Sequence, residues 1–424
     1  MSPIETATRA ANVCDALGIE LDPAGGPSGA PLARPRDEAE LTRLLQRVAN
    51  ETDPPRLAPL GGGTSVHWCR PEQARGDAPT LFVSTRSMVE ASGGSGIVEY
   101  VPGDGTLTAL GGTALDDLRA AVDEGGHRIT PALRGASTIG GTLAAGLSGP
   151  DRVAFGPSRH HVLGMRVVDG AGRRARSGGR LVKNVTGFDL HRLHVGARGT
   201  LGFVVEVSLR LTPAPESEAL LSSEPLATDA EAVELALALR ADRRLAPRML
   251  FVKDRVVHTL LAGRARQVDV ERAVWAEHAT PRDAFDGDAA EDRALALAER
   301  DPALRIQTTP SRVVSAVRAL GLASTDGLVV EPDAALVDVP RALVEGDVPR
   351  WTDEVLPALD AVGARVEPRA PFGDAVGEAL DGAIESRIAL SGPRATIMRR
   401  LVEAFDPAHV LAIEGFPAGL SIRP

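Results

Sequence analysis

Three consecutive glycines directly after a strand-like run are the first feature of this chain that could do chemistry. Residues 61–63 are Gly-Gly-Gly, and Thr64 and Ser65 follow them. Without Cβ atoms, successive backbone amides can turn toward one point and form an anion-binding nest, to which the two hydroxyls can add donors. Because the chain contains 44 glycines, an ordinary turn is an equally good interpretation of this loop taken alone.

Two further runs of small residues suit a backbone that lies close to a ligand. Residues 137–146 read Ser-Thr-Ile-Gly-Gly-Thr-Leu-Ala-Ala-Gly, which fits either a flat or phosphorylated ligand or close packing of a helix on a sheet. Residues 170–175, Gly-Ala-Gly-Arg-Arg-Ala, match the dinucleotide fingerprint G-x-G-x-x-A. That fingerprint needs an amphipathic helix after it, and none follows, so we expect a β-turn between two strands here.

Rare residue types mark another candidate position. Only two of the 47 basic residues are Lys, and only three Asn are present, yet Lys183 and Asn184 are adjacent. His191 and His194 stand three residues apart, a spacing that metal ligands on a helix use, but without a third ligand a partly exposed helix face is the better interpretation. His160 and His161 would point to opposite faces of an extended segment, so at most one could enter a pocket.

Composition excludes several classes of function. The formal net charge of -10 leaves no basic footprint for nucleic acid, and no signal peptide or run of about 18 apolar residues is evident. Cys14 and Cys69 are too few for a disulfide framework, a zinc site or an iron–sulfur cluster, so redox chemistry would need a bound organic cofactor. The Walker and Gly-x-Ser-x-Gly patterns are absent. We expect a cytoplasmic protein without a resident metal.

Mixed helices and strands must position these loops in the first half of the chain. Asp37 with Glu40 forms a capping-box pattern before a helix, and a second helix follows Thr113. Residues 203–211 alternate apolar and polar side chains, which predicts a strand buried on one side. Further strands are expected at residues 56–60, 81–84, 97–102 and 106–110.

Prolines place a domain boundary near residue 215, where Thr-Pro-Ala-Pro-Glu follows the alternating strand. We therefore divide the chain into residues 1–215 and 216–424. The second part alternates helices and short strands, as expected for helices on a small antiparallel sheet, and the fold class is α+β. Residues 279–293 are polar and Asp-rich, which predicts a surface excursion.

The order of the motifs along the chain resembles that of a known family, which no single motif would identify. The motifs are Gly-Gly-Gly-Thr at 61–64, Ser-Thr-Ile-Gly-Gly-Thr at 137–142, Leu-Ser-Gly-Pro at 147–150, Gly-Arg-Leu-Val-Lys-Asn-Val-Thr-Gly-Phe-Asp-Leu at 179–190, Gly-Thr-Leu-Gly-Phe-Val-Val-Glu-Val at 199–207 and, more thinly, Phe-Asp-Pro at 405–407. Taken together, they strongly resemble the FAD-binding domain of the vanillyl-alcohol oxidase and p-cresol methylhydroxylase (PCMH-type) family. Within that family the chain looks most like the glycolate oxidase subunits, especially the smaller flavin subunit. The resemblance covers about residues 35–215.

The resemblance implies a PCMH-type, two-subdomain FAD-binding domain over residues 1–215, followed by an α+β cap domain over residues 216–424. It also implies that the rare Lys183-Asn184 pair lies near the flavin, where Lys could stabilise a reduced anionic flavin or a substrate carboxylate. The implied cofactor-binding residues are Leu60, Gly61, Gly62, Gly63, Thr64, Ser65, Gly135, Ser137, Thr138, Gly140, Gly141, Thr142, Ala145, Gly146, Lys183, Asn184, Gly199, Thr200, Gly202 and Val204. The catalytic candidates near the flavin are Lys183, Asn184, Arg152, His160 and His161.

Departures from the family pattern qualify these expectations. Thr64 stands where covalently flavinylated relatives have His, so FAD is expected to bind non-covalently. Phe188 replaces the usual Tyr, and residues 412–416 lack the Asn-Pro-Gly expected there. The His-Gly-x-Gly element that supplies metal ligands and a base in the larger relatives is absent from the second half, so no catalytic base can be carried over.

The resemblance implies a flavin subunit that oxidises a small 2-hydroxy acid by hydride transfer and passes the electrons to a partner chain. The expected partners are a larger flavin subunit and an iron–sulfur subunit of a glycolate oxidase-like complex, which could bring the protein to a membrane surface. One alternative is a non-catalytic FAD-binding assembly or electron-relay subunit. Another is a stand-alone FAD oxidase or dehydrogenase of a different alcohol or sugar acid.

Overall fold

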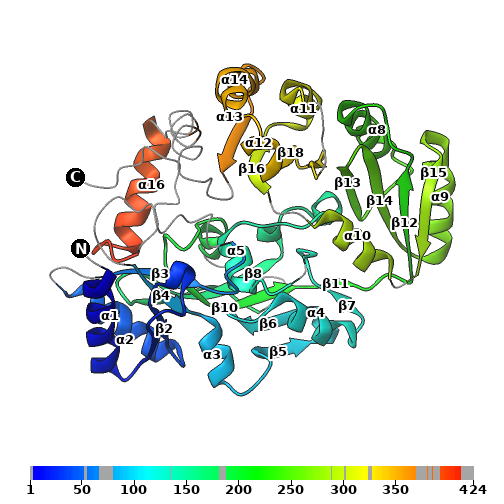
Figure 1. Ribbon diagram of the computed structural model, residues 1–424. Coiled ribbons are helices and arrows are strands. Elements are labelled where there is room, and N and C mark those ends of the chain that lie inside the picture. The colour runs from blue at the N-terminus through cyan, green and yellow to red at the C-terminus, as the bar shows by residue number, and fades with distance from the viewer. Residues whose placement is uncertain are drawn as a thin grey trace. The chain divides into compact units, whose positions relative to one another are not determined.

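The chain forms two compact units, which are described one at a time below (Figure 1). The computed structural model describes residues 3–51, 55–65, 80–133, 135–180, 188–287, 289–299, 302–322, 327–368, 380, 384 and 392–411. Along the chain, unit 1 comprises Met1–Ser148, Pro157–Ala214 and Leu390–Pro424, and unit 2 comprises Gly149–Gly156 and Pro215–Ala389. The chain passes from unit 1 to unit 2 between Ala214 and Pro215 and comes back for its last segment.

The first sheet of unit 1 has four strands in the order β1-β2-β4-β3. Strands β2, β4 and β3 run parallel, and β1 is antiparallel to β2. Its apolar side chains share one core with α1 and α2. The bounds are α1 Pro3–Leu17, β1 Glu20–Asp22, β2 Leu32–Arg34, α2 Glu38–Ala49, β3 Arg56–Leu60 and β4 Thr80–Ser84.

Helix α2 begins as its sequence predicts. The Asp37 side chain accepts a hydrogen bond from the Glu40 N–H at 2.8 Å, and the apolar stripe of the helix is fully buried. The second half of the capping box differs, because the Glu40 carboxylate accepts from the N–H of Arg36 (2.7 Å) instead of that of Asp37. Arg36 also pairs with Glu40 through its guanidinium, so the start of α2 is fixed by three groups.

The second sheet of unit 1 is antiparallel, with five strands in the order β5-β6-β10-β8-β9. Helices α4 and α5 share its apolar core. The turn between β8 and β9 confirms the predicted β-turn at residues 170–172. The bounds are β5 Ile97–Val101, β6 Thr106–Leu110, α4 Leu115–Asp123, α5 Ile139–Ala144, β8 Val162–Val168, β9 Arg174–Gly178 and β10 Phe203–Arg210.

Strand β10 corrects the expectation of a strand buried on one side only. It lies in the middle of its sheet, and its polar residues Glu206 and Ser208 are buried as well as its apolar ones, whereas Arg210 at its end is exposed. Glu206 is paired with Arg166 at 3.2 Å, and the Ser208 hydroxyl lies 2.9 Å from that of Thr108. Polar partners on neighbouring strands therefore let an alternating sequence occupy a two-sided interior.

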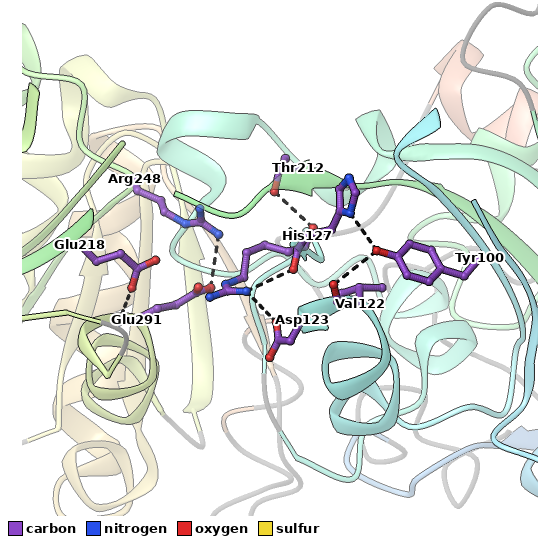
Figure 2. A network of polar contacts seen from close by, with 9 residues as sticks. Tyr100, Val122, Asp123, His127, Thr212, Glu218, Arg248 and Glu291 are labelled. Atoms are coloured by element: carbon purple, nitrogen blue, oxygen red, sulfur yellow. Dashed lines mark hydrogen bonds and ion pairs between the residues drawn. The ribbon is translucent and has the colours of Figure 1, made fainter. Parts of the chain in front are cut away.

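Smaller elements complete unit 1. Figure 2 shows the Tyr100 side chain of β5 directed at His127, with its hydroxyl 2.8 Å from Nδ1, which joins the sheet to β7. The Thr212 hydroxyl donates to the Arg128 carbonyl at 3.3 Å, beside the β7–β11 pair. The bounds are α3 Arg86–Ala91, β7 His127–Arg128, α7 His191–His194, β11 Thr212–Pro213 and α16 Gly392–Phe405.

Unit 2 is built on one antiparallel sheet of eight strands, in the order β15-β12-β14-β13-β17-β18-β16-β19. Helices and strands share a single large apolar core that includes Trp275 and Trp351. The α+β expectation is confirmed. The strands are β12 Ser217–Ser223, β13 Met249–Lys253, β14 Val256–Gly263, β15 Pro281–Asp286, β16 Pro302–Gln307, β17 Val329–Glu331, β18 Leu336–Pro340 and β19 Arg365–Pro368. The helices are α6 Arg152–Phe155, α8 Asp229–Ala241, α9 Ala265–His278, α10 Ala290–Ala298, α11 Val313–Leu320, α12 Arg341–Glu345, α13 Val348–Arg350 and α14 Leu356–Ala361.

Two features of unit 2 were not anticipated. The polar stretch expected to be a surface excursion contains β15, a fully exposed strand at the edge of the sheet. Residues 149–156 also belong to this unit, although they interrupt unit 1 in sequence. There the Arg248 guanidinium lies 5.4 Å from the centre of the Phe155 ring. Arg248 also pairs with Glu291 at 3.4 Å (Figure 2).

No helix in the part of the chain that the structure describes has both the length and the apolarity to cross a membrane.

Candidate cofactor site

A pocket in unit 1 brings together three glycine-rich segments that are far apart in sequence, and Thr85, which follows β4, lines it as well. The first is the end of β3 with the glycine loop that follows it, the second is α5, and the third is the loop that leads into β10. The lining residues are Pro59, Leu60, Gly61, Gly62, Gly63, Thr64, Ser65, Thr85, Thr138, Gly140, Gly141, Ala144, Ala145, Arg198, Gly199, Gly202 and Val204.

The three glycines of the first loop serve two purposes. A Cβ on Gly61 would lie 2.2 Å from the Thr138 hydroxyl oxygen, and one on Gly62 would lie 1.9 Å from the Ala136 carbonyl oxygen. These two glycines therefore allow one loop to pack against the other. Gly63 differs, because its φ of 75° lies in the left-handed region that favours glycine, and a Cβ there would meet no atom of a described residue within 4 Å. The open space beside Gly63 leaves room for a ligand.

Hydroxyl groups connect the first two segments. The Thr64 and Ser137 hydroxyl oxygens are 2.7 Å apart, and the Thr138 hydroxyl accepts from the Gly141 N–H at 3.2 Å to cap α5. Helix α5 also packs closely on the five-stranded sheet, since the Gly140 N–H donates to the Gly111 carbonyl at 2.8 Å. The small-residue run thus achieves close packing and at the same time forms a wall of the pocket.

The third segment is tied to α5 by its backbone. The Arg198 N–H donates to the Ala144 carbonyl at 2.7 Å, and Arg198 adopts a φ of 53° in the left-handed region that favours glycine. Gly202 lets this loop approach β8, because a Cβ there would lie 2.4 Å from the Val168 carbonyl oxygen. The loop is therefore held at a fixed position against both neighbours.

The structure gathers most of the predicted cofactor-binding residues in this one pocket. Gly135, Ser137, Thr142, Gly146 and Thr200 are described but do not line it. Lys183 and Asn184 lie outside the described residues. The predicted residues that line the pocket are Leu60, Gly61, Gly62, Gly63, Thr64, Ser65, Thr138, Gly140, Gly141, Ala145, Gly199, Gly202 and Val204.

Four lining residues were not among the predicted cofactor-binding residues: Pro59, Thr85, Ala144, which lies in the small-residue run 137–146, and Arg198. Arg198 directly precedes the Gly-Thr-Leu-Gly motif, and that position was the available signal for it. Thr85 carried no local signal, since it reaches the pocket only because β4 pairs with β3, where its N–H donates to the Leu60 carbonyl at 2.9 Å.

The remaining catalytic candidates do not gather at this pocket. His161 is buried in unit 1 and His160 is exposed, which agrees with the expectation that at most one of them faces inward. Neither lines the pocket. Arg152 begins α6, which belongs to unit 2. Catalytic roles for Arg152 and His161 stay predictions.

His191 and His194 are buried in α7, which corrects the expectation of a partly exposed helix face. Burial lowers the pKa of the His194 imidazole to about 4, and burial lowers the pKa of His191 as well. The His194 ring packs edge-on against Phe405 with centroids 5.5 Å apart. Both histidines are core residues, and no group of potential metal ligands occurs among the residues the structure describes.

The composition of the pocket fits a large ligand with a flat apolar part and an anionic part. Leu60, Val204 and Ala144 supply apolar wall, whereas the glycine loop and its hydroxyls supply polar groups beside open space. A dinucleotide such as FAD has both parts, and backbone nests of this kind accept phosphate oxygens.

Comparison with known proteins identifies the domain. Residues 30–178 match a family described as FAD binding domain. This match confirms the predicted cofactor and the predicted type of domain, and it covers two of the three segments that line the pocket.

Curated relatives match part of the chain. Glycolate oxidase subunit GlcE of Escherichia coli (strain K12) is 41% identical over 132 residues, which are 30% of this chain and 38% of that protein. D-2-hydroxyglutarate dehydrogenase of Xanthomonas citri pv. viticola is 36% identical over 38% of this chain and 34% of its own length. Glycolate oxidase subunit GlcD of Bacillus subtilis (strain 168) is 32% identical over 44% of this chain and 38% of its own length. The chain thus matches little more than a third of each of these relatives.

Solved structures extend the likeness to nearly the whole chain at the level of fold. A structure titled alkyldihydroxyacetonephosphate synthase has a TM-score of 0.59 and 15% identity, and it covers 91% of this chain and 76% of its own. At this identity the likeness shows a shared fold. It extends well beyond the FAD binding domain.

Proposed function

We propose that this protein is an FAD-dependent oxidoreductase subunit that oxidises a small 2-hydroxy acid and passes the electrons to a partner chain. The observation that carries the proposal is the convergence of three glycine-rich segments on one pocket of an FAD binding domain. FAD, when bound there, supplies an acceptor for the hydride that the substrate loses from its α-carbon.

The residues of this chain would hold the cofactor mainly through backbone and small side chains. The loop at residues 61–65 would receive the diphosphate, because it offers consecutive amides and two hydroxyls beside open space. Arg198 would add a cation at the same pocket, where it offsets phosphate charge. Thr64 stands where covalently flavinylated relatives have the His that carries the link, so we expect FAD to bind non-covalently and to be released when the protein unfolds.

The substrate class follows from the names of the relatives. GlcE and GlcD are named for glycolate oxidase, and the Xanthomonas relative is named for D-2-hydroxyglutarate. These substrates share a hydroxyl group on the carbon next to a carboxylate. We therefore propose a 2-hydroxy acid, with Lys183 and Asn184 as the side chains that contact the flavin or the substrate.

The electrons must leave through another molecule. Cys14 is buried, and burial together with Asp15 raises its pKa to about 11, which disfavours the thiolate that metal ligation requires. Cys69 lies outside the described residues, and two cysteines in the whole chain cannot hold an iron–sulfur cluster. An iron–sulfur partner is the acceptor we propose, together with a larger flavin subunit that supplies the substrate base.

A non-catalytic FAD-binding subunit is the second candidate. The observation that favours it is the lack of a His-Gly-x-Gly element in residues 216–424, which leaves this chain without an evident base. In that case FAD would serve structure or electron relay. The intact glycine loops and the pocket that they line count against a loss of FAD binding.

One experiment separates these candidates. The chain is tagged in its natural host, the complex is purified, and its flavin absorbance is followed without oxygen while glycolate or D-lactate is added. We expect this chain to copurify with a larger flavoprotein and a cysteine-rich chain, and we expect its flavin to bleach. A flavin in this chain that no 2-hydroxy acid reduces would favour the non-catalytic role, and bleaching of the isolated chain by a different alcohol would indicate a stand-alone enzyme.

A further inference from the structure

The last described segment of the chain lies against the FAD-binding unit. Helix α16 packs Val402 into a small apolar cluster with Ala197 and Leu201, which belong to the loop that lines the pocket. Val410 and Leu411 join the core that also contains Leu57 of β3. The segment is separated from the rest of unit 1 by the chain between Ala214 and Leu390, so its return requires specific contacts.

Asp406 organises the turn in which α16 ends. Its side chain is 2% exposed, and its two carboxylate oxygens accept hydrogen bonds from the Val410 N–H at 2.9 Å and the Leu411 N–H at 3.0 Å. The Asp406 carbonyl accepts from the N–H of His409, which adopts a φ of 51°. One carboxylate therefore fixes the path of the chain from residue 406 to residue 411.

The same turn is seated against the β8–β9 connection. The Phe405 carbonyl accepts from the Gly170 N–H at 2.9 Å, and a Cβ on Gly170 would lie 2.3 Å from the Asp406 carboxylate. Arg173 pairs with Asp169 at 2.7 Å and also donates to the Ala404 carbonyl. The Gly-Ala-Gly turn, which is not a dinucleotide fingerprint, thus provides the surface that receives Asp406.

The fixed segment continues as a neighbour of β3. The Leu57 N–H donates to the Val410 carbonyl at 2.7 Å, and Leu57 forms a parallel bridge with Leu411. Strand β3 is otherwise the edge of its sheet, because β4 pairs with it on one side only. Three residues after Leu57, β3 ends at Leu60 and the glycine loop of the pocket begins.

We infer that Asp406 is a positioning residue for FAD, which acts by holding the Val410–Leu411 segment along β3 and so fixing the glycine loop at residues 61–63. The inference rests on the proposed binding of FAD at that loop. Without the carboxylate, the Val410 and Leu411 N–H groups lose their acceptors, β3 loses its second neighbour, and the loop must be ordered by the cofactor itself. The cost of that ordering appears as weaker FAD binding.

The test measures FAD affinity and local protection in matched variants of the full chain. Asp406→Ala removes both acceptors, and Asp37→Ala is the control because it removes a partly buried hydrogen bond at the start of α2 in the same unit. We expect the FAD dissociation constant to rise at least about fivefold in Asp406→Ala and to stay within about twofold of wild type in Asp37→Ala. Without FAD, hydrogen exchange at the Leu57 amide should accelerate in the first variant only.

Equal FAD dissociation constants for Asp406→Ala and Asp37→Ala would overturn the inference. If Asp406→Ala does not fold, Asp406→Asn keeps one acceptor and the shape of the side chain, and its FAD affinity and Leu57 exchange are decisive in the same way. A wild-type chain that binds no FAD would contradict the proposed function and this inference together, whereas normal FAD binding by both Asp406 variants contradicts the inference alone.

Discussion

At the scale of single residues, Arg198 combines backbone strain with a place in the cofactor pocket. A non-glycine residue at positive φ costs on the order of 1 kcal/mol, and such residues are found where the surroundings or function require the side chain. Arg198 lines the pocket beside Gly199, and its N–H bond to Ala144 holds the conformation in place. We interpret the strain as the cost of keeping a guanidinium near the diphosphate.

Replacing Arg198 by glycine separates the two effects. Arg198→Gly should raise the free energy of unfolding of the FAD-free protein by up to about 1 kcal/mol, because glycine adopts positive φ without strain. The same variant should bind FAD at least about fivefold more weakly, because a charge-assisted contact is lost. Urea unfolding without FAD and FAD titration measure the two quantities.

Arg255 provides the matched control, since it adopts a φ of 63° in the β13–β14 turn of unit 2 and does not line the pocket. Arg255→Gly should give a similar gain in stability and leave FAD affinity unchanged. Tighter or unchanged FAD binding in Arg198→Gly would show that the guanidinium plays no part in holding the cofactor.

At the scale of elements, the buried His258 makes the stability of the unit 2 sheet depend on pH. His258 of β14 is 7% exposed, stacks on Phe251 of β13 with ring centroids 5.0 Å apart, and lies 2.9 Å from the Ser222 hydroxyl of β12. Burial, with a smaller contribution from Lys253, lowers the pKa of His258 to about 4. The folded state therefore favours the neutral ring.

The sign of the pH effect follows from that lowered pKa. The ordinary pKa of His258 is 6.5, so its share of stability is complete above that pH and is lost as pH falls toward about 4. Between about pH 7 and pH 5 the loss should be about 2 kcal/mol for this one group. Urea unfolding, followed by the fluorescence of Trp275 and Trp351 in the core of unit 2, measures it.

His258→Gln should lose most of this pH dependence, whereas His160→Gln, which changes an exposed histidine of unit 1, should retain it. A wild-type protein whose unit 2 is equally stable at both pH values would contradict a buried, neutral His258.

Local patterns were sufficient to predict some elements and insufficient for others. The capped helix α2 and strands β3 and β6 matched their predicted bounds closely, because caps, turns and periodicity act within a few residues. Strand β10 looked half-exposed because Arg166 and Thr108, the partners of its polar side chains, come from distant strands. The burial of His191 and His194 depended likewise on packing that no local pattern encodes.

Most residues of the pocket could be predicted because they lie in motifs that follow one another along the chain in the order typical of the resembled family. The sequence could not show which of the glycines at 61–63 pack against another loop and which lies beside open space. That distinction depends on Ala136 and Thr138, which belong to the neighbouring loop. Thr85 was missed because only strand pairing brings it to the pocket. Asp406 stood in a thin Phe-Asp-Pro resemblance whose structural use became evident only from its contacts.

At the scale of the whole molecule, the unit that contains the pocket is assembled from segments that are far apart in the sequence. The family match ends at residue 178, yet the pocket also needs residues 198–204, and the segment at 392–411 supports β3 from the far end of the chain. Unit 2 is inserted between the last two of these, with its own core and its own sheet. FAD affinity should therefore respond to changes near both ends of the sequence.

The central claim is that the three-segment pocket binds FAD non-covalently, and the visible absorbance spectrum of the purified wild-type chain tests it most directly. The spectrum is recorded as purified, after addition of FAD and removal of the excess, and again on the soluble fraction after denaturation. We predict the bands of an oxidised flavin at about one FAD per chain, all of it released on denaturation. A chain that neither carries flavin nor retains added FAD, or one whose flavin stays attached after denaturation, would contradict the account.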